Sequence, residues 1–153
     1  MLNGPPNPPI SLTFNGSKLK NFPSDEIRLA RLFQTFLDPQ RATHIEGISL
    51  ESKSFLEVAH ELAQHGWVFL LGENFPPFET YLKGLNHKKS EIKSLSFILS
   101  DNIDLEKQEE ERLIKELDAK PISLGTKSYL ASHCIIFLLI ELNRLHFFNN
   151  LEG

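Results

Sequence analysis

Apolar residues follow two kinds of pattern along this chain, and their alternation predicts an α/β fold. The continuous apolar run from Trp67 to Leu71 is typical of a parallel strand buried on both faces, and Leu95 to Leu99 (LSFIL) is predicted to be another buried strand. Ile10 to Phe14 alternates apolar with small polar residues, which predicts another strand. Pro121 to Leu124 is a short strand that ends at Gly125. Because helical patterns separate the strands, we expect a parallel sheet flanked by helices on both faces.

Helical spacing of apolar residues predicts four helices, and turn residues mark some of their ends. Ser24 and Ser128 are the expected N-caps of the first and last helices, and Gly66 ends the second. Gly47 to Leu50 fits either a short strand or a loop, and residues 75–93 are predicted to be irregular. The predicted helices span residues 25–37, 54–65, 104–117 and 130–145.

The last predicted helix is apolar on every side. Such a helix is either deeply buried or divided between the core and a partner interface. The pattern alone favours a core helix. The alternative is that the Gly125 turn cradles a small ligand while the helix packs against a second subunit. One face carries Cys134, Phe137, Leu138, Leu142 and Leu145, and the others carry Ile135, Ile136, Leu139 and Ile140.

Composition indicates a single domain over residues 1–153, with 41% hydrophobic and 24% charged residues. The lone Cys134 cannot form an internal disulfide, and no secretory signal is visible, so we expect a cytoplasmic protein. The longest apolar run, Cys134 to Ile140, is too short to cross a membrane. A net charge of −4 argues against a surface that is basic throughout, but allows a local basic patch. Candidate phosphate contacts are Lys18, Lys20, Lys83, Lys88, Lys89 and Lys127.

Three strand ends in the sequence are candidates for a ligand site. In open α/β sheets, ligands bind beyond the carboxyl ends of the strands. Small residues in the turns allow a ligand to approach backbone groups, as the edge of an adenine ring requires. A single such turn is most often a plain strand end, but three of them at one edge indicate a site. The turns are Leu70-Leu71-Gly72, Leu99-Ser100-Asp101 and Ser123-Leu124-Gly125.

Three other motifs do not predict a catalytic or metal site. His60 and His65 are five residues apart, so on a helix they point in different directions and cannot share a metal ion. Cys134 lies inside an apolar run, where cysteine is most often a small buried hydrophobic residue. Residues 109–111 are all Glu and indicate a solvated helix face. We therefore expect no metal centre.

Two segments carry a resemblance to a known family. The first is Ile122-Ser123-Leu124-Gly125 followed by Leu130-Ala131-Ser132-His133-Cys134-Ile135, and the second is Gly4 to Pro9 with the strand after it. Both resemble motifs of the archaeal tRNA (pseudouridine-54-N1)-methyltransferases, which belong to the SPOUT class. The resemblance extends over nearly the whole chain.

The resemblance implies a fold, a cofactor and a substrate. SPOUT enzymes thread these three loops into a C-terminal trefoil knot that binds S-adenosylmethionine, and they form homodimers through the last helix. The implied reaction is methyl transfer to N1 of pseudouridine 54 in the T-loop of tRNA. Asp101 is the side chain expected to act on the proton or to orient the base. The implied cofactor contacts are Leu70, Leu71, Ser100, Ile122, Ser123, Leu124, Gly125, Leu130 and Cys134.

The chain also departs from the family pattern. The family motif Gly-Asp-His-Ile-Gly reads Ser100-Asp101-Asn102-Ile103-Asp104 here. A Cβ at Ser100 would crowd the cofactor if the backbone φ there were positive. The family's N-terminal strand and helix, which precede the proline motif, are missing from this sequence, so we expect either a fragment or mis-called start, or a shortened relative that has lost or changed its activity. These departures leave an alternative: a catalytically silent SPOUT-like dimer that binds RNA or a protein.

Overall fold

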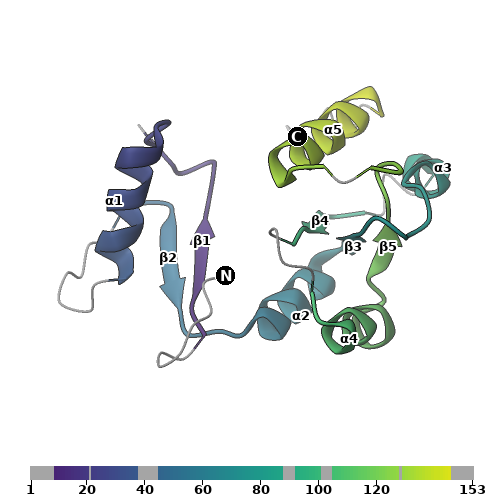
Figure 1. The fold of residues 1–153 in the computed structure, drawn as a ribbon, viewed down its shortest axis with the longest axis horizontal. Helices are drawn as coiled ribbons and strands as arrows, with labels where there is room; N and C mark the ends of the chain where they lie inside the picture. The colour runs from purple at the N-terminus through teal and green to yellow at the C-terminus, as the bar shows by residue number, and fades with distance from the viewer. Residues whose placement is uncertain are drawn as a thin grey trace. The chain divides into compact units, whose positions relative to one another are not determined.

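The computed structural model describes residues 9–20, 22–37, 45–87, 92–100, 105–127 and 129–145. The chain divides into two compact units, residues 1–58 and 59–153, with the boundary inside α2. The elements, labelled in Figure 1, are β1 (Ser11–Phe14), α1 (Glu26–Leu37), β2 (Ile48–Glu51), α2 (Phe55–His65), β3 (Trp67–Leu71), α3 (Glu79–His87), β4 (Leu95–Ile98), α4 (Lys107–Leu117), β5 (Lys120–Ile122) and α5 (Ala131–Arg144).

The first unit contains an antiparallel pair of strands, β1 and β2, and the helix α1. The segment that fitted either a strand or a loop is therefore a strand. The side chain of Asp25, and not of Ser24, caps α1, because its Oδ1 accepts the backbone N–H of Arg28 at 2.9 Å. The ring of Phe14 packs edge-on against Phe22 and Phe33, at centroid distances of 5.5 and 6.0 Å.

The second unit is built on a parallel sheet with the strand order β4-β3-β5. This confirms the predicted parallel sheet flanked by helices. The central strand β3 is the most apolar of the three, since it has a strand on each side and helices over both faces. Figure 1 shows α2 and α4 on one side of the sheet and α3 and α5 on the other.

Side chains of β3 alternate between two cores, as the pleat of a strand requires. Phe69 points to one face, where it forms a buried cluster with Phe78, Leu85, Ile122 and Leu138. These partners come from the segment before α3, from α3, from β5 and from α5. The opposite face of β3 carries Val68 and Leu70, and α2 and α4 contribute the buried residues Ala59 and Leu113.

Two predictions about helices were wrong in detail. Residues 79–87 form α3, within the segment predicted to be irregular. The last helix begins at Ala131 with Leu130 at the N-cap, and no side chain caps it. Ser128, the predicted cap, lies outside the described residues.

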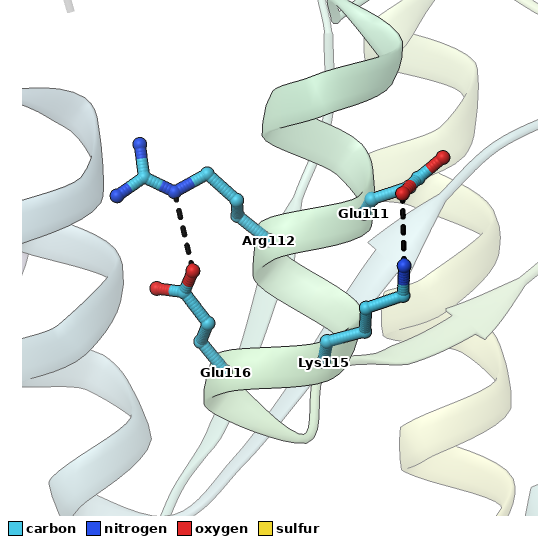
Figure 2. Close-up of polar contacts among 4 residues, drawn as sticks. All are labelled: Glu111, Arg112, Lys115 and Glu116. Carbon is cyan, nitrogen blue, oxygen red and sulfur yellow. Dashed lines mark hydrogen bonds and ion pairs between the residues drawn. The ribbon is translucent and has the colours of Figure 1, made fainter.

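The acidic helix α4 is a solvated surface, as its sequence predicted. Lys115 Nζ lies 2.9 Å from Glu111 Oε2, and Arg112 Nε lies 3.3 Å from Glu116 Oε1 (Figure 2). Both pairs are four residues apart on one turn of the helix, where opposite charges support each other. The hydrogen bond from Lys115 lowers the pKa of the Glu111 carboxyl. No group of three metal-ligating side chains occurs in the described ranges.

A reciprocal capping box starts α2 and provides a test of local stability. The Ser54 hydroxyl accepts the N–H of Glu57 at 3.3 Å, and the Glu57 carboxylate accepts the N–H of Ser54 at 2.7 Å. Replacing Ser54 with alanine should therefore lower the free energy of unfolding by about 1 kcal/mol. Chemical denaturation at neutral pH measures this loss, and an unchanged midpoint would contradict it.

The same motif predicts a pH dependence. Hydrogen bonds from the backbone and side chain of Ser54 lower the pKa of Glu57 below its usual 4.5. The stabilisation is therefore present above the unfolded-state pKa and is lost as pH falls through the folded-state pKa. We expect the stability difference between wild type and Glu57→Gln to shrink from about pH 7 to about pH 3. A difference that stays constant over that range would contradict the capping role.

Candidate functional site

The carboxyl ends of three parallel strands meet at one edge of the sheet, because β3, β4 and β5 all run in the same direction. A cavity of about 640 Å³ opens at this edge. Small-molecule sites usually have volumes of about 300 to 1,000 Å³. The lining residues come from all three strand ends and from the start of α5: Leu71, Gly72, Glu73, Leu99, Ser100, Ser123, Leu124, Gly125, Lys127, Tyr129, Leu130, Ala131, His133 and Cys134.

Backbone hydrogen bonds join two of these strand ends. The N–H of Gly72 donates to the carbonyl of Ile122 at 3.0 Å. Ser123 donates its N–H to the carbonyl of Pro76 at 2.8 Å and accepts the N–H of Phe78 at 2.9 Å. The turn after β3 and the turn after β5 are thus held together as one wall of the cavity.

Ser123 and Gly125 set the shape of the second turn. The buried Ser123 hydroxyl donates to the Gly125 carbonyl at 2.7 Å and accepts the Gly125 N–H at 3.2 Å. Gly125 has a φ of +151°, a conformation that side-chain-bearing residues rarely adopt. A Cβ at this position would lie 3.3 Å from the Tyr129 hydroxyl. The turn therefore favours glycine at position 125 both for its backbone conformation and for its small size.

Ser100 fits its position without backbone strain. Among the described residues other than glycine, only Asp118 has a positive φ. Ser100 is among the described residues and lines the cavity, and its φ is not positive. The positive φ under which its Cβ would crowd a ligand is therefore absent. The departure from the family motif at this residue therefore leaves the cavity open.

The structure brings together most of the residues named from the sequence. Leu70 and Ile122, at 1% and 0% exposure, instead belong to the core beneath the cavity. Asp101 lies outside the described residues, so its predicted role stays a prediction. The named residues that line the cavity are Leu71, Ser100, Ser123, Leu124, Gly125, Leu130 and Cys134.

Sequence reasoning missed several polar residues of the lining. Glu73, Tyr129 and His133 were not assigned to the site. Tyr129 lies directly between the Gly125 turn and the apolar run, and this position is the sequence signal that could have been used. The cavity consequently carries a carboxylate at Glu73 and a cation at Lys127 beside its apolar walls.

The surroundings of Cys134 do not activate its thiol as a nucleophile. Burial raises the pKa of its thiol above the usual value of 9.0. The thiol is therefore protonated at neutral pH, and the thiolate that attacks electrophiles is scarce. His133 is its neighbour on α5, but successive residues of a helix point in different directions.

The site residues fit an adenosine-containing ligand in size and chemistry. Leu71, Leu124 and Leu130 supply apolar surface, and the turns at Gly72 and Gly125 bring backbone groups to the rim. Such sites combine mainly hydrophobic walls with a few placed polar groups.

No described helix is long and apolar enough to cross a membrane.

Comparison with known proteins gives one family. Residues 1–147 match the model of the family described as "Putative SAM-dependent RNA methyltransferase". A tRNA (pseudouridine(54)-N(1))-methyltransferase of Methanococcus vannielii is 34% identical over 147 residues, covering 93% of this chain and 71% of the relative. The protein of the same name from Thermococcus gammatolerans is 29% identical over 154 residues, covering 95% and 71%. The chain belongs to this family of S-adenosylmethionine-dependent RNA methyltransferases.

Proposed function

We propose that the protein transfers a methyl group from S-adenosylmethionine to N1 of pseudouridine 54 in tRNA. The main support is the cavity, since the three turns that the sequence assigned to the cofactor line a single hollow at one sheet edge. The relatives named for this reaction match most of the chain, which supports the same substrate. A tRNA substrate also agrees with the cytoplasmic location predicted from the sequence.

The residues that would hold the cofactor are those of the two joined turns and of the first turn of α5. Leu71, Leu124 and Leu130 would enclose the adenine ring, while the turn at Gly125 presents backbone close to the ligand. The bonds between Ser123 and Gly125 hold that turn in place. The trefoil knot implied by the family stays a prediction, and it would explain how the loops keep their positions.

When bound, S-adenosylmethionine supplies an electrophilic methyl group. The chain's own task is to orient N1 of the base in line with that group and to let the N1 proton leave. Asp101, which follows Ser100 in the sequence, remains our candidate for contacting this proton. Lys127 lines the cavity and can contact a phosphate of the RNA backbone.

We also propose a homodimer in which α5 packs against its copy. Leu138 and Leu142 are the buried side chains of α5, whereas much of the remaining helix surface leaves large apolar side chains exposed. Monomers rarely expose contiguous apolar patches of this kind without a partner. Sedimentation at micromolar concentration tests this proposal, and a monomer would contradict it. The exposed residues are Ile135, Ile136, Leu139 and Ile140.

Two measurements test the proposed reaction. Isothermal calorimetry should show saturable binding of S-adenosylmethionine. Mass spectrometry of nuclease digests should then show one added methyl group on a tRNA that carries pseudouridine 54, and none on the transcript with uridine 54. Binding without transfer would favour the silent dimer, and absence of binding would overturn the proposal.

A further inference from the structure

Tyr129 is an aromatic side chain at the rim of the cavity that the core does not use. It is 49% exposed and lines the cavity. Its ring lies against the Gly125 turn, with the hydroxyl and Cε2 at 3.3 and 3.4 Å from where a Cβ of Gly125 would be. The other tyrosine of the chain, Tyr81, packs edge-on against Phe69 in the core, at a centroid distance of 5.7 Å. Tyr129 therefore lies against the turn and leaves much of its surface free.

The groups beside Tyr129 suit a nucleotide. Lys127 lines the same cavity and is exposed, so its ammonium group can reach a phosphate. Leu130 is 68% exposed at the same rim and adds apolar surface. Exposed aromatic and cationic side chains together are the usual means by which proteins hold an unpaired base and its backbone.

Such a surface suits the proposed reaction. N1 of a base in folded RNA becomes readily accessible to a cavity at a sheet edge when the base leaves its stack. The displaced base loses its stacking neighbours, and an aromatic ring can replace them. We propose that Tyr129 is the stacking platform for the flipped-out pseudouridine, with Lys127 holding the adjacent phosphate. This inference rests on the proposed function and assigns the residue that binds its substrate base.

The test compares RNA affinities, so that it does not depend on methyl transfer. Fluorescence anisotropy measures the Kd of a T-arm hairpin that carries either pseudouridine or an abasic residue at position 54. In the wild type, the abasic hairpin should bind on the order of tenfold more weakly, because it lacks the stacked base. The ratio of the two Kd values, that of the abasic hairpin divided by that of the pseudouridine hairpin, should fall to near one in Tyr129→Leu. In Tyr129→Phe this ratio should be retained because the ring remains.

Control measurements separate stacking from a structural role. Leu62→Ala changes an exposed apolar residue of α2 outside the cavity lining and should leave the ratio as in the wild type. In Tyr129→Leu, the affinity for S-adenosylmethionine should change by a smaller factor than the RNA ratio does. A lost affinity for S-adenosylmethionine would overturn the proposal, since Tyr129 would then only shape the Gly125 turn.

The RNA-affinity test of Tyr129 can succeed or fail independently of the methyl-transfer test. A ratio near one in the wild type, or an unchanged ratio in Tyr129→Leu, overturns the stacking role even if methyl transfer occurs. If the ratio depends on Tyr129 but the protein transfers no methyl group, the stacking role is supported and only the proposed reaction is contradicted.

Discussion

Replacing Phe69 with alanine should lower the free energy of unfolding by about 4 kcal/mol. Phe69 is fully buried at the centre of β3 and belongs to the cluster that joins the sheet to α3 and α5. Its ring stacks on Phe97 at a centroid distance of 5.2 Å and meets Phe78 edge-on at 5.6 Å. The substitution removes this apolar surface and leaves a cavity that neighbouring rings can fill only in part.

Urea denaturation followed by circular dichroism measures this loss. Phe69→Leu is the matched control, because it keeps most of the apolar volume and should cost less than the alanine variant. Equal losses for the two variants, or a loss below about 1 kcal/mol, would show that the cluster is not the main core of this unit.

Replacing Gly125 with valine should weaken binding of S-adenosylmethionine on the order of thirtyfold. Gly125 has a φ of +151°, which costs a β-branched residue about 1 to 3 kcal/mol. The new Cβ would also press on Tyr129, whose hydroxyl lies 3.3 Å from that position. The turn must move to relieve both effects, and about 2 kcal/mol corresponds to this change in Kd.

Calorimetric titration with S-adenosylmethionine measures the effect. Gly16→Val is the matched control, because a Cβ at Gly16 meets nothing within 4 Å and the residue lies outside the cavity lining. Wild-type affinity in Gly125→Val would mean that the turn after β5 does not contact the cofactor.

Local patterns predicted the strands of the parallel sheet and the edge where the cavity lies. The apolar patterns at β3 and β4 predicted both strands, although β4 lies at the sheet edge and is mostly only half-buried. The turn residues after the strands line the cavity. Leu70 and Ile122 illustrate the limit of this reasoning. A sequence motif names a stretch of chain, but not which of its side chains stay in the core. The pleat turns Leu70 toward α2 and α4, whereas Ile122 shares the face of Leu71 and is covered by the Phe69 cluster.

The helix α3 was missed although its signal was present. Phe78, Tyr81, Leu82 and Leu85 have the spacing of a helix face, and all four belong to or pack against the core cluster. Gly84 inside the helix and two prolines just before it weakened that signal. Helix starts were misplaced for a related reason, since Ser24 and Asp25 are both good caps and only the backbone decides which one is used.

The strain expected at Ser100 depended on a torsion angle that residue types do not determine. Glycine in the family motif suggested a positive φ, but the chain adopts an ordinary φ at this position. Glycine at Gly125, in contrast, does mark a positive φ. The presence of glycine in a sequence motif therefore does not show whether its backbone conformation is needed or whether another residue can replace it.

The double hydrogen bond of Ser123 has a thermodynamic consequence. Because its hydroxyl satisfies both the N–H and the carbonyl of Gly125, this turn is ordered before any ligand arrives. Ordering a mobile loop upon association costs entropy, and a loop that is already ordered avoids that cost. Removing this hydroxyl would thus make the entropy of association more unfavourable while changing its heat little.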